Sequence, residues 1–192
     1  MSKNAMWLTI IFAAAIFGAF LGPSLGSLLG ETTMLILAPL FLIGVVAFCI
    51  WALSSNKSGK KADTAALAEA RAMKAPEGKG RIYITRRGFV AALQGMNVTL
   101  DGKATGQIKS GQMLMADVEP GTHHLHVGTA KAKLANAGEM DIEIGAGGVV
   151  VIDAMIEMGA LKGSIKLTRL DAAKARENVN ATALILWEVA PA

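Results

Sequence analysis

The chain has 192 residues, of which 53% are hydrophobic and 18% are charged, and its formal net charge is +4. Beyond roughly the first 55 residues, this length leaves room for one small domain. Residues 1–80 hold seven basic and four acidic side chains, and residues 81–192 hold twelve and eleven. A nucleic-acid-binding domain would gather its basic residues on a folded face, so we expect no nucleic-acid partner. Cys49 is the only cysteine, which excludes an intramolecular disulfide.

The first 53 residues form the most distinctive part of the sequence. Between Ala5 and Leu53 the only charged residue is Glu31, and two apolar segments lie at about 6–29 and 33–53. A membrane-spanning helix needs about 20 apolar residues, so the pattern predicts a two-helix transmembrane hairpin over residues 1–55. Membrane lipid and other integral membrane subunits would then be its partners. No acidic or basic residue lies inside either segment, which argues against an ion or proton pathway.

Small residues recur every four positions in the first apolar segment. They are Ala14, Gly18, Gly22, Gly26 and Gly30. Residues four apart lie on one face of a helix, so this row predicts a packing face for the second span. Pro23 interrupts the row. The alternative therefore ends the first helix near Leu21 and makes residues 22–33 a loop.

Aromatic and basic residues flank the two apolar segments. Trp7 and Trp51 lie at ends that an antiparallel hairpin would bring to one side of a membrane, and Lys57, Lys60 and Lys61 follow the second segment. Tryptophan prefers the headgroup level and lysine the cytoplasmic side, so these residues are predicted membrane-interface anchors. The corresponding location is the bacterial inner membrane, with two spans and both chain termini in the cytoplasm.

The rest of the chain predicts a linker and then a β domain. Residues 56–80 form a basic linker with a short helix over 62–74, which Asp63 or Thr64 could cap. Short alternating segments with turn signals predict about eight strands in an antiparallel β-sandwich over residues 81–170. Asp101-Gly102 is a strong hairpin signal within it. The predicted fold class is thus an α+β membrane protein, with a transmembrane hairpin followed by the sandwich.

The C-terminal tail, residues 171–192, ends in an apolar segment at 183–189. This segment is too short, and at Glu188 too acidic, to span a membrane. It could be a last strand packed on its own domain, a segment lying on the bilayer, or a docking segment for a partner. In the last case Leu184, Leu186 and Trp187 would make the contact.

Three histidines form the only polar cluster that could hold a metal ion. On a strand, His124 and His126 share one face while His123 points to the other. Two imidazoles would still need a third ligand from another strand, such as Asp117 or Glu119. Because adjacent histidines without a second motif are unspecific, His124 and His126 are weak candidate ligands. The simpler interpretation is a half-exposed strand.

Carboxylates of the same strand face are the other candidates for chemistry. Asp153 and Glu157 share strand parity, but no nucleophile or metal motif accompanies them, so we expect both on a solvated face. The sequence contains no phosphate-binding loop, no Gly-x-Ser-x-Gly elbow and no Cys-x-x-Cys pair. We therefore expect no enzyme activity and no cofactor.

The turn residues of the predicted β domain form a recognisable order: a strand, an Asp-Gly-Lys hairpin, a glycine, and Pro-Gly-x-His. They are Arg81-Ile82-Tyr83, Val98–Lys103, Gly106, Gly111, Asp117-Val118 and Pro120–His123. Residues 81–127 thereby resemble an uncharacterised bacterial family of small, PEGA-like β-sandwich domains, often described as lipoproteins. The resemblance implies a β-sandwich and a location in the cell envelope. It brings no catalytic residues.

These features favour one functional hypothesis over two others. The leading one is a non-catalytic, membrane-anchored accessory or scaffold subunit of a larger bacterial membrane protein complex, with the β-sandwich docking on the cytoplasmic face. The first alternative is a ligand- or carbohydrate-binding module of the cell envelope. The second is a metal-binding enzyme that uses the histidine cluster.

Overall fold

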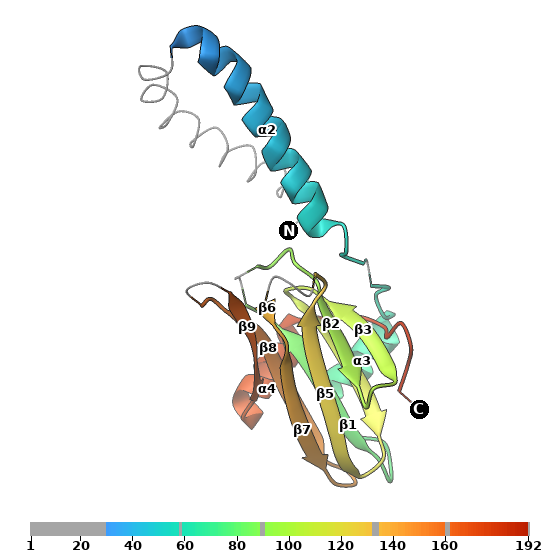
Figure 1. Cartoon of the computed structure of the whole chain (residues 1–192). Coiled ribbons are helices and arrows are strands. Elements are labelled where there is room, and N and C mark those ends of the chain that lie inside the picture. Colours follow the sequence, from blue (N-terminus) through green and yellow to red (C-terminus); the bar gives the residue numbers. More distant parts are fainter. Residues whose placement is uncertain (1–29, 58, 89–90, 132–134, 160–161, 192) are drawn as a thin grey trace. The chain divides into compact units, whose positions relative to one another are not determined.

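The structure is a computed structural model of the chain, and it describes residues 30–57, 59–88, 91–131, 135–159 and 162–191 (Figure 1). The chain divides into two compact units, Met1–Trp51 and Ala52–Ala192. The second unit is larger than the β domain predicted for residues 81–170, because it includes the linker and the C-terminal tail.

Helix α2 (Glu31–Leu53) is the element described for the first unit, and it has 23 residues. Gly30 precedes it with a φ of +78°, a turn conformation that favours glycine, and no atom lies within 4 Å of where its Cβ would be. The ring centroids of Phe48 and Trp51 lie 6.0 Å apart in a tilted arrangement. After Glu31 the helix carries no charged side chain, and it contains Pro39.

The predicted membrane hairpin is wrong. In the described ranges no helix is both long enough and apolar enough to cross a membrane. The membrane part of the fold class, the transmembrane helices and the multi-pass inner-membrane location all depended on that hairpin. The prediction rested on apolar composition alone, which measures a preference for an apolar environment but does not establish a spanning helix. The first predicted span, with Trp7, Ala14, Gly18, Gly22 and Gly26, lies outside the described residues.

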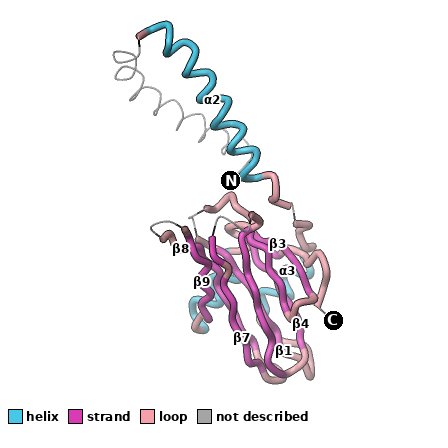
Figure 2. The backbone as a smooth tube through the Cα atoms, in the orientation of Figure 1, coloured by secondary structure: helices cyan, strands magenta, loops and turns pink. Residues whose placement is uncertain are grey.

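The second unit contains two β-sheets. One sheet has six strands in the order β10-β4-β1-β8-β9-β6, and the other has four in the order β3-β2-β5-β7. In Figure 2 the magenta strands form the body of this unit. The larger sheet contains β1 (Gly80–Arg86), β4 (Gln112–Val118), β6 (Ala135–Asn136), β8 (Val149–Glu157), β9 (Gly163–Arg169) and β10 (Ala183–Leu184). The smaller sheet contains β2 (Met96–Leu100), β3 (Ala104–Ile108), β5 (Gly121–Thr129) and β7 (Gly138–Ile144).

Strand pairing in the larger sheet is mixed, so the prediction of a wholly antiparallel sandwich is wrong. Strand β1 pairs antiparallel with β4 but parallel with β8. Strand β10 is parallel to β4, and β6 is parallel to β9. Parallel neighbours need a long crossover connection. Between β1 and β8 that connection contains the whole smaller sheet.

Two apolar clusters lie on opposite faces of the larger sheet. One fills the space between the sheets, and in it Ile82 and Ile84 of β1 are fully buried. The other lies under helices α3 (Thr64–Ala72) and α4 (Ala172–Ala181), and Tyr83 of β1 is fully buried in it. Strand β1 is therefore buried on both faces along its length. The second unit thus has three layers: the smaller sheet, the larger sheet and two helices.

Two local signals in the sequence are confirmed. Asp101 and Gly102 have φ angles of 54° and 67°, as the tight turn of a hairpin requires, and β2 pairs antiparallel with β3 across them. Asp63 caps α3, because its Oδ1 accepts the N–H of Ala66 at 2.7 Å.

Candidate functional site

The C-terminal tail closes one open side of the sandwich. Strand β10 extends the larger sheet, and Ile185 is buried between the sheets. Thr105 of β3 and Val189 exchange two backbone hydrogen bonds of 3.0 Å. Trp187 packs against the core, and its Nε1–H donates to the carbonyl of Met115 at 2.7 Å. The tail therefore connects the neighbouring edges of both sheets.

The three predicted docking residues lie in different environments. Leu184 is 5% exposed and belongs to the cluster under the helices, whereas Leu186 is 43% exposed. Trp187 is half-buried in its own domain. The tail contributes the short strand β10 to its own domain, which is the first of the three alternatives for this segment. Of the three residues, Leu186 has the surface that another molecule could contact.

The three lysines that follow α2 contact the tail. Lys57 Nζ forms an ion pair of 2.5 Å with Glu188. The backbone carbonyl of Lys60 accepts the N–H of Leu186. Lys61 forms an isolated antiparallel β-bridge with Ile185. The role of these lysines as membrane-interface anchors stays a prediction. The linker and the tail thus run beside each other along the edge of the sandwich.

His123 holds the Asp101-Gly102 turn. Its Nδ1 lies 2.7 Å from Asp101 Oδ2, and its Nε2 lies 2.8 Å from the carbonyl oxygen of Glu119. Both partners are acceptors, so both contacts are hydrogen bonds only when the ring carries two protons. Partial burial acts to lower the pKa of His123, but the hydrogen bonds to Asp101 and Glu119 outweigh it and raise the pKa overall.

His124 and His126 lie on the outer face of the smaller sheet and face carboxylates of β7. His124 Nδ1 lies 2.7 Å from Asp141, and this hydrogen bond is the main cause that raises the pKa of His124. His126 Nε2 lies 3.9 Å from Glu139. Among the described residues there is no group of three or more potential ligands that could hold a metal ion. These two histidines therefore form cross-strand pairs with acidic residues.

Arg81 is a buried charge between the larger sheet and α3. It is 1% exposed, and its Nε and Nη2 atoms bind the two oxygens of Asp117 at 2.6 and 2.8 Å. Its Nη2 also donates to Glu69 of α3 at 2.6 Å. The hydrogen bond to Asp117 is the largest effect on the pKa of Arg81 and raises it against the opposing effect of burial. This arrangement holds α3 on the sheet.

Asp153 lies under α4, and the prediction that it faces solvent is wrong. Its exposed fraction is 7%. Thr85 Oγ1 donates to Asp153 Oδ1 at 3.0 Å, and Asn178 of α4 donates to Thr85 Oγ1 at 3.3 Å. Burial raises the pKa of Asp153, and the hydrogen bond from Thr85 opposes this effect. Strand parity alone could not predict the burial, because a helix far along the chain covers this face.

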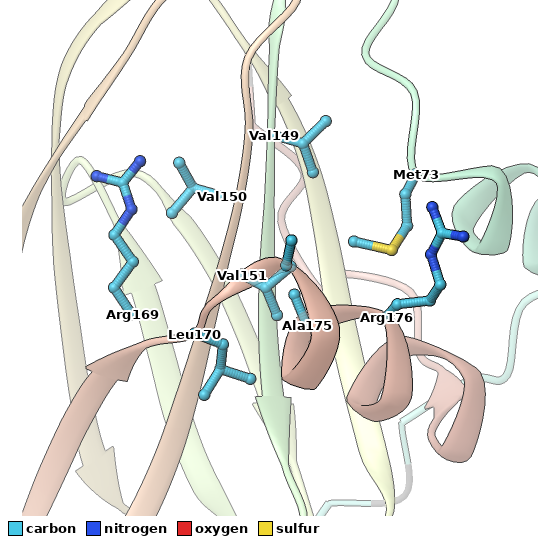
Figure 3. Close-up of a pocket in the computed structure, with 9 residues that line it drawn as sticks. Met73, Val149, Val150, Val151, Arg169, Leu170, Ala175 and Arg176 are labelled. Carbon is cyan, nitrogen blue, oxygen red and sulfur yellow. The ribbon is translucent and has the colours of Figure 1, made fainter.

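Two hollows lie on the surface of the second unit. The first has a volume of about 280 Å³ and is shown in Figure 3. It is lined by Met73, Val149, Val150, Val151, Arg169, Leu170, Ala172, Ala175 and Arg176. The second, of about 500 Å³, is lined by Ser55, Lys57, Asn97, Val98, Thr99, Thr105, Gly106, Gln107, Ala130 and Glu188. Neither lining contains a histidine, so neither hollow includes the weak candidate ligands His124 and His126.

No protein-family model matches the chain, and no curated protein matches it. The similarity to PEGA-like domains therefore stays a prediction, based on the turn residues named above.

Proposed function

We propose that this chain is a non-catalytic accessory or scaffold subunit of a larger protein assembly. One observation carries the proposal: large apolar side chains of α2 are 41–73% exposed. They are Leu35, Ile36, Leu37, Leu40, Phe41, Leu42, Ile43, Val46, Phe48, Ile50 and Trp51. Residues 40–43 are four in succession, so they point to every side of the helix. A helix that is apolar on all sides is normally buried against other apolar groups.

The exposed surface of α2 provides a driving force for association. Burying one large apolar side chain contributes roughly 1.5–3 kcal/mol. Several such side chains together can exceed the cost of immobilising two proteins and their side chains. The partner that suits α2 is another polypeptide with an apolar surface.

The contacts of the second unit support a structural role for it. Arg81 and Asp117 bind each other and position α3, and Thr85 and Asp153 bind each other beneath α4. These buried polar groups bond to one another and thereby hold the helices on the larger sheet. A rigid unit of this kind is suited to docking beside a partner that α2 has engaged.

The experiment is purification of the full-length protein from its native source, followed by chemical crosslinking and mass measurement. We expect a stoichiometric protein partner with crosslinks to α2. The variant Leu40→Asn/Ile43→Asn should lose that partner. Leu93→Asn changes a leucine of the second unit that is 43% exposed and should keep it. A lone monomer, or equal loss of the partner in both variants, would contradict the proposal.

A ligand-binding module is the second candidate, because of the hollow of about 500 Å³ on the smaller sheet. Its lining is largely polar and includes Asn97, Thr99 and Thr105. The lining has no aromatic ring on which a sugar could stack, so a small polar ligand fits better than a carbohydrate. A thermal-shift screen tests this candidate. A ligand that raises the Tm of the protein, but not that of Thr99→Val/Thr105→Val, would support it over the scaffold role.

A further inference from the structure

The smaller sheet ends in β3 on one side and in β7 on the other (Figure 1). At the β3 edge an extended segment already pairs with the sheet, because Thr105 and Val189 of the tail exchange two backbone hydrogen bonds of 3.0 Å. At the other edge, β7 pairs with β5, and within the described residues no second strand pairs with it. The two edges of this sheet therefore differ in that one is covered and the other is not.

The strand register shows which backbone groups of β7 face this uncovered edge. In an antiparallel pair, every second residue bonds to the partner strand, and the residues between them face the other way. Asp101 N–H donates to the carbonyl of His124, so the even-numbered residues of β5 bond to β2. The odd-numbered residues of β5 then bond to the even-numbered residues of β7. The backbone N–H and C=O groups of Glu139, Asp141 and Glu143 consequently face away from the sheet.

The side chains of β7 alternate between acidic and apolar. Those of Glu139 and Asp141 are 62% and 71% exposed on the outer face of the sheet, and Glu143 is also exposed. Met140, between them, is partly buried and packs against the core between the sheets. Strand β9 lies against the first residue of β7, where a Cβ on Gly138 would be 2.6 Å from a backbone oxygen of β9. The uncovered edge therefore begins at Glu139.

We propose that the β7 edge binds an extended segment of a partner protein in which basic residues alternate with apolar ones. The segment adds to the sheet as an antiparallel strand and bonds to the outward-facing backbone groups. Its residues opposite Glu139, Asp141 and Glu143 have their side chains on the same face, where lysine or arginine pairs with each carboxylate. Its intervening residues point inward beside Met140, where valine or isoleucine fits. This site is separate from α2 and does not depend on the scaffold proposal.

Charge excludes the β7 strand of a second copy as the occupant. In an antiparallel pair of two β7 strands centred on Asp141, that residue would lie opposite its own counterpart, and Glu139 would lie opposite Glu143. Like charges directly opposite each other destabilise a strand pair. The same three carboxylates favour a strand that carries the opposite charge at every second position.

Titration of the full-length protein into the fluorescein-labelled peptide Lys-Val-Lys-Val-Lys-Val-Lys, followed by fluorescence anisotropy, tests the side-chain part of the proposal. A peptide with four lysines followed by three valines has the same composition but cannot place its charges on one face, so it should bind about tenfold more weakly. The triple variant Glu139→Gln/Asp141→Asn/Glu143→Gln should also weaken binding by about tenfold or more, since each pair contributes up to roughly fivefold. Glu177→Gln removes an exposed carboxylate from α4 and should leave the affinity unchanged.

Asp141→Pro tests the backbone part, because it removes an N–H that faces the edge, a position where a strand tolerates proline. It should bind the alternating peptide more weakly than Asp141→Asn, which loses the same charge but keeps the N–H. Hydrogen exchange in the wild-type protein gives a readout that needs no variant. The peptide should slow exchange of the amides of Glu139, Asp141 and Glu143, whereas those of Met140 and Ile142 already bond to β5 and should change little.

Four results would overturn the proposal. They are equal affinity for the two peptides of the same composition, unchanged binding by the triple variant, exchange that is not slowed at the three outward-facing amides, and no binding of the alternating peptide. Circular dichroism spectra and Tm values of the variants establish that each one is folded.

Discussion

At the scale of single residues, the buried charge of Arg81 lies where a helix meets the larger sheet. Arg81 has both oxygens of Asp117 and one of Glu69 as partners, and its side chain is 2% exposed. Tyr83, two residues along β1, donates its hydroxyl to the carbonyl of Ala70 at 2.7 Å. Both side chains thus attach α3 to β1 through directed bonds. Apolar packing alone would define its position less sharply.

Asp117→Asn should destabilise the protein strongly. It leaves the buried Arg81 guanidinium with a weaker partner, and removing one member of a buried ion pair costs about 3–5 kcal/mol. We expect a loss near the lower end of that range, because Asp117 is 30% exposed. Denaturant unfolding followed by far-ultraviolet circular dichroism measures it. Glu69→Gln is the control: Glu69 is 61% exposed, so we expect a change within about 1 kcal/mol. Equal losses for the two variants would refute this account.

His123 should make folding stability depend on pH. Its pKa in the folded protein is raised above the ordinary value of 6.5, so the native state binds the proton more tightly than the unfolded state does. The stabilisation is therefore fully present below about pH 6.5 and is lost as the pH rises through the higher folded pKa. We expect the stability difference between wild type and His123→Gln to shrink over this interval in urea unfolding. His126→Gln is the control, and a difference that grows with pH would contradict the assignment.

At the scale of elements, local signals predicted local structure, and distant contacts determined the rest. The Asp101-Gly102 hairpin and the Asp63 cap depend on a few adjacent residues, so the sequence sufficed to predict them. The parallel pairing of β1 with β8 depends on a crossover that no local pattern encodes. Strand parity alone predicted that Asp153 faces solvent, because parity does not show that α4 covers this face of the sheet. The outward-facing backbone groups of β7 were missed for a similar reason, since only its pairing with β5 determines which groups they are.

The tail shows how a short segment can hold two sheets together, and Trp187 should be its main contact. Trp187→Ala removes the packing against the apolar cluster between the sheets and the hydrogen bond to the carbonyl of Met115. Truncating a buried tryptophan costs about 3–5 kcal/mol, and we expect about 2 kcal/mol here because Trp187 is half-buried. Thermal and urea unfolding measure the loss. Leu186→Ala, at the exposed neighbouring position, should change stability by no more than about 0.5 kcal/mol. Similar losses for both would show that Trp187 does not anchor the tail.

At the scale of the whole molecule, the chain consists of two units with different surfaces. The first contains α2, whose apolar side chains are exposed, and the second contains three layers with internal ion pairs. The second unit starts at Ala52, well before the first strand. The linker residues Ser55, Lys57, Lys60 and Ala62 belong to it because they bond to β3 and to the tail. The point at which the chain can be cut without loss of stability is therefore set by these contacts.

The fragment 52–192 should fold without the first unit, whereas the fragment 81–192 should be much less stable. The longer fragment keeps the linker, the ion pair between Lys57 and Glu188, and α3 with its bonds to Arg81 and Tyr83. The shorter fragment loses all of these and uncovers part of the apolar cluster under the helices, which costs about 25 cal/mol for each Å² exposed. We expect one cooperative thermal transition for 52–192, at a Tm close to that of the same unit in the full chain, and a broadened or absent transition for 81–192. Equal Tm values for the two fragments would mean that α3 and the linker only lie on the sandwich without stabilising it. A fragment 52–192 that fails to fold would mean that the second unit depends on residues before Ala52.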